Sequence, residues 1–275
     1  MTDRIIDFHI HVGDKQHWAP GSLELSQSFE NGSGAQWDAD GRVDVDSLLA
    51  HMDDAGVEHA CLIPVDAQRA GTATLEVAAR GRGRLHPFVW VDPRNAPDAP
   101  AQLEAAIDRG AKGLKVHLVH SAIYANDPGL YPLYEVCRDR GIPVMFHTGS
   151  SIFPGARHRF SDPMMIDEAA EDFPDLQLLC AHAGRGFWEA QTFFLARIRT
   201  NVHLEMSGVP AARVLQLFPE LDRIRDRVVY GSDWPAAPSL DVVAERFRAL
   251  PLSPASLTAM MRENAVRLLG LPTVA

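Results

Sequence analysis

Short apolar runs rich in β-branched residues alternate along the chain with amphipathic stretches of helical period. The apolar runs predict eight strands, at residues 5–11, 59–65, 86–91, 113–118, 143–147, 176–181, 202–206 and 228–231. The amphipathic stretches predict a helix after each strand and one more at the end of the chain, at residues 45–55, 74–80, 99–109, 130–140, 164–172, 188–199, 211–218, 240–249 and 254–269. This alternation is typical of a parallel sheet covered by helices.

The segments that join these elements differ in length. Those from helix to strand are short and marked by glycine or proline, whereas those from strand to helix are long, notably residues 12–43, 119–129 and 148–162. A doubly wound open sheet also alternates, but long segments at the carboxyl ends of the strands are typical of a barrel that carries its active site there. We therefore predict an α/β protein, a single (β/α)8 TIM barrel with a C-terminal helix, forming one domain over residues 1–275.

The first predicted strand carries two histidines, His9 and His11. Residues two apart on a strand face the same side, so both imidazoles would point into the barrel lumen. Two inward imidazoles form half of a site for a divalent metal such as zinc. By itself, however, such a pair on a strand is also compatible with ordinary packing.

Three further polar residues stand at the ends of predicted strands. His147 ends the fifth strand, His182 follows the sixth, and Asp233 follows the eighth. Taken singly, His147 could be a core histidine and Asp233 a turn former. If the barrel closes, all three meet His9 and His11 at one mouth. The joint pattern therefore favours a metal site over five separate structural roles.

Four motifs in this order resemble the amidohydrolase superfamily, and most closely its amidohydrolase-2 family. They are the Asp-Phe-His-Ile-His opening at 7–11, His-Thr-Gly at 147–149, His-Ala-Gly at 182–184 and Gly-Ser-Asp-Trp-Pro at 231–235. That family includes aminocarboxymuconate-semialdehyde decarboxylase and related metal-dependent hydrolases. The resemblance covers essentially the whole chain, including the closing helix.

The resemblance implies a set of roles for these residues. The metal ligands would be His9, His11, His147 and Asp233, and His182 would position or activate the attacking water or assist as a general acid or base. We expect one divalent ion rather than two. Zn²⁺ is the first choice, and Mn²⁺ stays an alternative because nitrogen and oxygen ligands suit several divalent ions. Bound zinc lowers the pKa of a coordinated water to about 7. Asp233, with an ordinary pKa near 4, could both ligate the metal and accept a proton.

Lys115 and His117 lie two apart on the fourth predicted strand, so both could face the lumen. An unpaired ammonium in a barrel core is costly, which indicates a function or a partner for Lys115. Three roles are open. Lys115 could be carboxylated and bridge two metals, as in binuclear members of the superfamily, it could bind an anionic substrate group, or it could form an ion pair with an acidic neighbour.

Substrate contacts must come from the long loops and from residues beside the ligands. Arginine binds carboxylates with two parallel hydrogen bonds. For Arg185, which is close to His182 in the sequence, carboxylate binding and a solvated surface role are about equally supported, whereas the surface role is the stronger alternative for Arg157. The candidates for substrate binding are Lys115, His117, Arg185, Trp18, Arg157 and Trp234.

These residues predict a metal-dependent hydrolase that directs a metal-activated water onto a small amide, lactone or related ring, with a carboxylate on the substrate as an option. The alternative is a non-oxidative decarboxylase, a carbon–carbon lyase, of a small carboxylated ring or muconate-like acid. Both reactions begin with the same ligands. The length of the chain slightly favours the hydrolase, since decarboxylases of this family tend to be longer. An inactive barrel is a third alternative, against which the intact set of five residues argues.

Composition narrows the class of protein further. A chain of 275 residues, 46% of them apolar, can bury a large core, which excludes intrinsic disorder and small disulfide scaffolds. A net charge of −10 lacks the electrostatic footprint of a nucleic-acid binder, and no apolar run is long enough to span a bilayer. Three scattered cysteines suggest a reducing compartment. We therefore expect a cytoplasmic protein with a small-molecule substrate and no nucleic-acid or membrane partner; a homodimer is compatible with the sequence.

Overall fold

The computed structural model describes residues 4–12, 24, 32–37, 41–64, 71–96 and 98–272. In this part of the chain one sheet contains eight strands in the order of the sequence, and every neighbouring pair is parallel. The strands are β1 (Ile5–Val12), β2 (Val57–Pro64), β3 (Leu85–Val89), β4 (Gly113–Val116), β5 (Val144–His147), β6 (Leu178–Ala181), β7 (Val202–Glu205) and β8 (Val228–Val229).

The sheet closes on itself because the chain around β8 bonds back to β1. The Phe8 N–H donates to the Tyr230 carbonyl at 2.9 Å, and the Asp233 N–H donates to the His9 carbonyl at 3.0 Å. The protein is therefore a (β/α)8 TIM barrel, as predicted, and not an open doubly wound sheet. Closure also brings residues from the two ends of the chain side by side.

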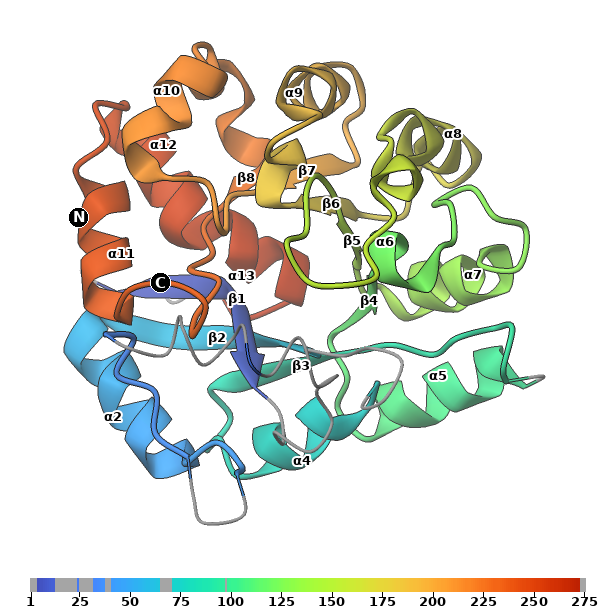
Figure 1. The fold of residues 1–275 in the computed structure, drawn as a ribbon, viewed down its shortest axis with the longest axis horizontal. Helices are drawn as coiled ribbons and strands as arrows, with labels where there is room; N and C mark the ends of the chain where they lie inside the picture. The colour runs from blue at the N-terminus through green and yellow to red at the C-terminus, as the bar shows by residue number, and fades with distance from the viewer. Residues whose placement is uncertain are drawn as a thin grey trace.

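Helices form a ring around the strands (Figure 1). The helices of this ring are α2 (Val45–Ala55), α4 (Ala73–Ala79), α5 (Ala99–Asp108), α7 (Tyr131–Arg140), α8 (Met164–Asp172), α9 (Glu189–Ile198), α10 (Val214–Leu217) and α11 (Leu240–Arg248). Shorter helical turns lie between these elements, namely α6 (Leu118–Ser121), η2 (His158–Ser161), η3 (His182–Gly184), η4 (Ala211–Arg213) and η5 (Leu221–Arg227).

The helix predicted at 211–218 is broken into two pieces, η4 and α10. No residue of η4 is buried, whereas Val214 at the start of α10 is. Most helical stability in proteins comes from packing an apolar face, so an unpacked first turn is not held in a regular α-helix. The turn α6 was not predicted and lies in the segment expected to be a loop.

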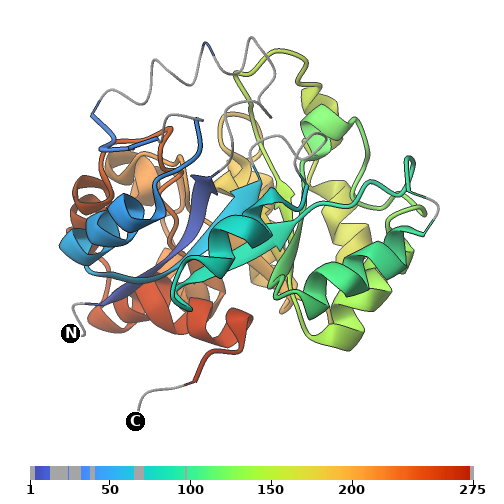
Figure 2. The same ribbon diagram turned by 90° about the horizontal axis from the view of Figure 1, so that it is seen from below.

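The C-terminal helix closes the lower end of the barrel in Figure 2. It runs through α12 (Pro254–Thr258), a π-helical turn η6 (Ala259–Glu263) and α13 (Asn264–Leu269), where a single helix at 254–269 was predicted. Val266 and Leu269 of α13 pack with Ile6 and Phe8 of β1, which face the lumen. The barrel is thus filled from below, and the upper end remains for the functional groups.

Local sequence accounts for the placement of α2. The Asp44 side chain accepts a hydrogen bond from the Ser47 N–H at 3.1 Å, which satisfies one of the free donors at the helix start. Leu48 and Met52, four residues apart on one face, are buried in the core between helices and sheet. The period of the apolar residues therefore sets which face of the helix meets the barrel.

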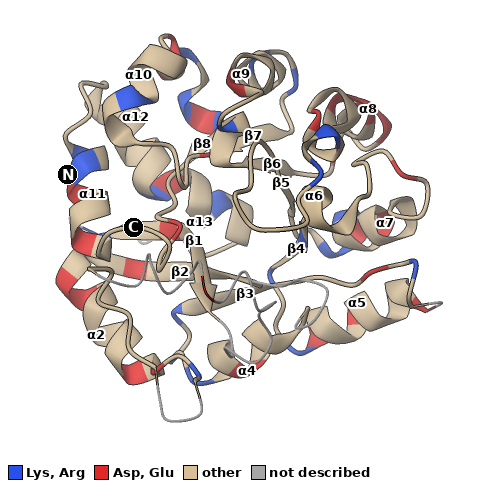
Figure 3. Ribbon diagram, in the orientation of Figure 1, with Lys and Arg blue, Asp and Glu red and all other residues tan. Residues whose placement is uncertain are grey.

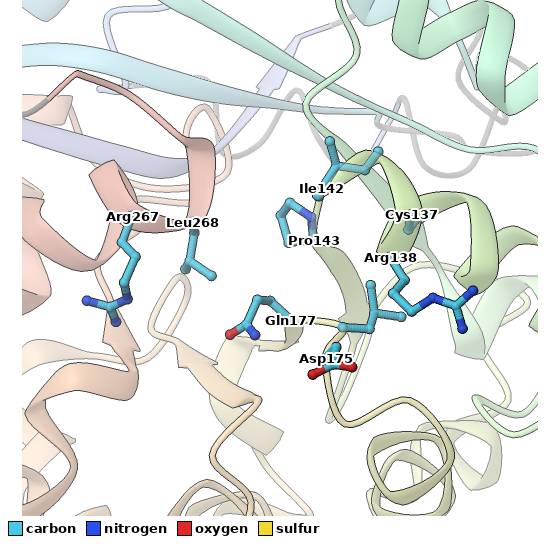
Figure 4. Close-up of a pocket in the computed structure, with 10 residues that line it drawn as sticks. Cys137, Arg138, Ile142, Pro143, Asp175, Gln177, Arg267 and Leu268 are labelled. Carbon is cyan, nitrogen blue, oxygen red and sulfur yellow. The ribbon is translucent and has the colours of Figure 1, made fainter.

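A cavity of about 410 Å³ opens at the amino-terminal ends of β5 and β6, opposite the carboxyl ends of the strands (Figure 4). It is lined by Cys137, Arg138, Gly141, Ile142, Pro143, Asp175, Leu176, Gln177, Arg267 and Leu268. Active sites of (β/α)8 barrels lie at the carboxyl ends, so this cavity is separate from the candidate site.

Charged residues of both signs are distributed around the outer helices (Figure 3). Among the described residues, no helix combines the length and the apolar character that a membrane span requires.

A buried histidine pair predicts how stability depends on pH. His86 Nε2 lies 3.1 Å from His59 Nδ1, and burial lowers the pKa of His86 to about 4. Unfolding restores a pKa near 6.5, so below that pH the unfolded chain binds the extra proton. We expect the free energy of unfolding to fall by about 3 kcal/mol for this group as the pH drops from 6.5 to 4.

Urea unfolding of the wild type and of His86→Gln at pH 7 and pH 4.5 measures this difference. The variant should lose less stability on acidification than the wild type. His158→Gln, which removes a half-buried histidine elsewhere, is the control. Equal losses in all three proteins would contradict the assignment.

Candidate functional site

The chemically active side chains lie in or near the carboxyl ends of the strands. They come from six different strands or the residues that directly follow them: His9 and His11 (β1), Lys115 (β4), His147 (β5), His182 (β6), Glu205 (β7) and Asp233 (β8). All except His11 are buried. The predicted convergence of residues far apart in the sequence is therefore what the barrel produces.

Three acceptor atoms form a compact triangle at this site. His9 Nε2 lies 3.3 Å from His11 Nε2, and Asp233 Oδ1 lies 3.7 Å from the first and 3.3 Å from the second. Ligands held about 2.1 Å from a tetrahedral metal ion are about 3.4 Å apart. The triangle therefore has the dimensions of one face of such a coordination sphere.

Hydrogen-bond partners identify which ring nitrogens face the triangle. His9 Nδ1 lies 2.8 Å from Glu205 Oε2, and His11 Nδ1 lies 3.2 Å from the Ile63 carbonyl. A carbonyl and a carboxylate only accept, so each Nδ1 carries the proton and each Nε2 presents a lone pair. Two lone pairs facing each other at 3.3 Å repel unless a cation lies between them. The donor set therefore fits a metal ion.

Burial favours the protonation states that a metal requires. Removal from water holds the pKa of His9, His147 and His182 well below the usual value of 6.5, so these rings are neutral at pH 7. For Asp233 burial acts to raise the pKa, but interactions with the surrounding imidazoles, His182 first, outweigh it and lower the pKa well below its usual range. The carboxylate is thus ionised, and the histidines are free to ligate.

The backbone around the site is held in an unusual conformation. His182, Ala183 and Asp233 have φ of 64°, 46° and 67°, in the left-handed region that residues other than glycine rarely adopt. Next to them, a Cβ at Gly208 would come 1.8 Å from Arg185 Nη1. Such conformations persist where the surrounding structure holds them, and they are common at functional sites.

His147 and His182 extend the site beyond the triangle. Their ring centroids are 4.6 Å apart. His9, His182 and Asp233 each offer one possible ligand atom, and these three atoms lie within 4.8 Å of one another. His147 Nε2 is buried and has no hydrogen-bond partner among the described residues. The position of His182 therefore also allows it to be a ligand, whereas the sequence suggested only a role beside the metal.

His117 and Lys115 both lie in this region, as their spacing predicted. The His117 ring stacks on His147 with centroids 4.2 Å apart. Lys115 is 1% exposed, its Nζ lies 3.6 Å from Met145 Sδ, and burial lowers its pKa to about 8. Among the described residues no carboxylate lies within 4 Å of the Lys115 ammonium, although Glu205 and Asp233 act on its pKa from further away. Carboxylation and contact with an anionic substrate group remain.

Arg185 is a candidate substrate residue whose side chain contacts a member of the triangle. Its Nη1 lies 3.6 Å from Asp233 Oδ2 and donates to the Gly208 carbonyl at 3.2 Å, while Nη2 donates to the Ser150 carbonyl at 3.4 Å. The side chain is 31% exposed. The guanidinium is therefore fixed at the edge of the site with part of its surface open to a ligand.

The other three substrate candidates lie elsewhere. Trp18 is outside the described residues. The side chain of Arg157 is exposed, and none of its contacts in the described structure reaches the triangle. The Trp234 indole is 1% exposed and donates to the Ser33 carbonyl at 2.8 Å, so it packs in the core behind the barrel.

Sequence reasoning missed two residues of the site, Glu205 and Ser207. Glu205 ends β7 and is fully buried, and Ser207 lies two residues further on. A carboxylate at the end of a predicted buried strand is itself a signal, because such a charge needs partners. It could have been recognised from residues 202–206 alone.

Metal binding should stabilise the fold. The triangle predicts uptake of one Zn²⁺ per chain, and Zn²⁺ at 100 times its Kd should raise the free energy of unfolding by about 2.7 kcal/mol. Asp233→Asn should abolish most of this gain, while Asp46→Asn, an exposed position on α2, should retain it. Calorimetric titration and thermal unfolding measure both. Equal gains for the two variants would contradict the ligand assignment.

Comparison with known proteins gives relatives over the whole length. An uncharacterized TIM-barrel protein from Bordetella bronchiseptica is 24% identical with a TM-score of 0.76, covering 97% of this chain and 98% of that one. A manganese-bound 5-carboxyvanillate decarboxylase from Novosphingobium aromaticivorans is 16% identical with a TM-score of 0.72, covering 98% and 97%. A probable 2-pyrone-4,6-dicarboxylic acid hydrolase from Acinetobacter baumannii, with citric acid bound, is 16% identical with a TM-score of 0.70, covering 98% and 100%.

These three likenesses show the shared barrel fold. No curated protein matches the chain. The family model described as Amidohydrolase (Amidohydro_2) matches residues 6–271. That range contains β1 with its two histidines, all the other strands and the closing helix. The chain therefore belongs to the amidohydrolase-2 family.

Proposed function

We propose that this protein is a metal-dependent hydrolase that opens a small carboxylate-bearing lactone, amide or related ring. The observation that carries this proposal is the triangle of His9 Nε2, His11 Nε2 and Asp233 Oδ1, with an arginine beside it. Three inward-facing acceptors with no proton between the two imidazole nitrogens are suited to a divalent ion, and the arginine is suited to a carboxylate.

His9, His11 and Asp233 would hold one ion, for which we favour Zn²⁺ with Mn²⁺ as the alternative. The unpartnered His147 Nε2 supports His147 as a further ligand. When bound, the ion supplies a Lewis acid that polarises a carbonyl oxygen and acidifies water. Asp233 would keep one carboxylate oxygen toward this position and the other toward Arg185.

His182 would move the proton in this reaction. Its ring is neutral, buried and within 4.6 Å of the His147 centroid, so it lies beside the position where a ligand would react. A neutral imidazole can take a proton from water and return it to the leaving group. Arg185 would meanwhile hold a substrate carboxylate, because its guanidinium is fixed by two backbone carbonyls and still partly open.

A non-oxidative decarboxylase is the second candidate. Related structures carry both activities in their names, a carboxyvanillate decarboxylase and a pyrone dicarboxylic acid hydrolase, and both names describe carboxylated rings. The same side chains could serve either reaction. In the decarboxylase, His182 would take a proton from water and deliver it to the ring carbon from which CO₂ leaves. Chain length does not separate the two, because the alignment covers 97% of the decarboxylase and 100% of the hydrolase. We keep the hydrolase as the first candidate and expect a small-molecule substrate in either case.

Isotope labelling separates the two reactions. The Zn²⁺-loaded protein is incubated in ¹⁸O-water with carboxylated pyrones and with carboxylated phenols, and the products are examined by mass spectrometry. A hydrolase incorporates one ¹⁸O into an opened ring and releases no CO₂. Release of CO₂ with retention of the ring would instead establish the decarboxylase.

Arg185→Lys tests the substrate carboxylate. Lysine keeps the charge but loses the two-pronged geometry, so we expect KM for a carboxylate substrate to rise about tenfold, equivalent to 1.4 kcal/mol. For the methyl ester of that substrate, which lacks the anion, KM should rise much less. Steady-state kinetics with the acid and its ester measure the contrast. An equal rise in KM for the acid and the ester would exclude Arg185 as the carboxylate partner.

A further inference from the structure

Glu205 is the residue on which two of the site's histidines converge. Its carboxylate is fully buried, and Oε2 lies 2.8 Å from His9 Nδ1 and 2.7 Å from Ser207 Oγ. Its other oxygen, Oε1, accepts from the backbone N–H of Ser207 at 2.8 Å. The backbone N–H of His182 approaches Oε2 at 3.4 Å. A buried carboxylate is thereby supplied with donors on both oxygens, as burial of a charge requires.

Ser207 connects this carboxylate to the second histidine. Its Oγ lies 2.9 Å from His182 Nδ1, and its own carbonyl lies 3.1 Å from the same nitrogen. The hydroxyl has a single proton. At 2.7 Å from Glu205 Oε2 that proton goes to the carboxylate, which leaves the lone pairs of Oγ to accept.

The proton on His182 is therefore assigned as well. Both of its Nδ1 neighbours, the Ser207 carbonyl and the Ser207 hydroxyl oxygen, act as acceptors, so Nδ1 must carry hydrogen. Nε2 is then the unprotonated nitrogen, and it belongs to the side of the ring turned away from Ser207. His9 receives the same assignment, because its Nδ1 lies 2.8 Å from Glu205 Oε2 and 3.1 Å from Ser207 Oγ, which both accept.

The backbone of Gly231 packs closely against this carboxylate. A Cβ on Gly231, just after β8, would lie 2.1 Å from Glu205 Oε1 and 2.8 Å from His9 Cβ. The residue that adjoins the carboxylate from β8 therefore has to be glycine. Close packing on this side holds Glu205 in the position from which it reaches both His9 and Ser207.

We propose that Glu205 is a positioning residue that, directly for His9 and through Ser207 for His182, fixes both rings in the Nδ1–H form. One buried carboxylate would thus prepare a metal ligand and the proton-transferring histidine together. This inference rests on the proposed function for the use of the two Nε2 atoms. The hydrogen-bond assignment itself concerns the metal-free protein and stands apart from it.

Two readouts on the purified protein test the proposal. Long-range ¹H–¹⁵N NMR of ¹⁵N-histidine protein reports which ring nitrogen is protonated, with the His182 signals identified by their loss in His182→Gln. The wild type without metal should show His9 and His182 as Nδ1–H forms, with a preference of about tenfold or more. Calorimetric titration with Zn²⁺ alone gives the affinity.

Glu205→Gln should change both readouts. An uncharged amide can turn its N–H toward His9 Nδ1, so we expect a mixed tautomer at His9 and His182 and a loss of Zn²⁺ affinity of 10- to 100-fold. Ser207→Ala should disturb the tautomer of His182 more than that of His9 and reduce Zn²⁺ affinity less. Glu58→Gln removes the same charge from the start of β2, where it pairs with Arg262, and should change neither.

The outcomes separate cleanly. Unchanged tautomers in Glu205→Gln, or an Nε2–H form of His182 in the wild type, would overturn the proposal whether or not Zn²⁺ binds. Absence of Zn²⁺ binding in the wild type would refute the proposed function, and the tautomers would still decide the role of Glu205. If Glu205→Gln does not fold, Ser207→Ala and the wild type supply the test, and an unaltered His182 in Ser207→Ala overturns the relay through Ser207.

Discussion

The site depends on the closure of the barrel between β1 and the chain after β8. Backbone hydrogen bonds from Phe8 to Tyr230 and from Asp233 to His9 join segments more than 200 residues apart in sequence. Without that closure the carboxylate of Asp233 would have no reason to lie 3.7 Å from His9 Nε2. The same bonds hold Asp233 in a left-handed conformation, so the geometry of the triangle follows from the main chain.

Electrostatics in the lumen follow from burial. Histidines removed from water remain neutral, a carboxylate among them remains ionised, and Glu205 lies below with hydrogen-bond donors on both oxygens. Lys115, without an ion pair in the described structure, is the cation that this arrangement does not otherwise explain. The cluster therefore combines neutral imidazoles, two carboxylates and a buried ammonium within one lumen. A cluster of this kind is consistent with a site that works on charged molecules.

The extent to which the sequence predicted this protein differs between fold and site. All eight strands were found because buried parallel strands are short, apolar and β-branched. The helix at 211–218 was wrong in form, because its first turn has no core to pack on. Glu205 was missed although a carboxylate at the end of a buried strand signals that it has partners; only its partner, His9, could not be read from that strand. Trp234 was assigned to the substrate from its place beside Asp233, but its indole is buried in the outer core and donates to the Ser33 carbonyl.

The sequence by itself determined the class of fold, the family, and which residue types stand at the ends of strands 1, 5, 6 and 8. Those features are local, because hydrophobic period and motif order are read directly along the chain. Only the tertiary structure decided which nitrogen of each histidine faces inward, that Lys115 is buried near Glu205 and Asp233, and that Glu205 and Ser207 lie behind the ligands. These depend on contacts between strands that are neighbours in space, and a hydrogen bond has a direction only when both partners are in position.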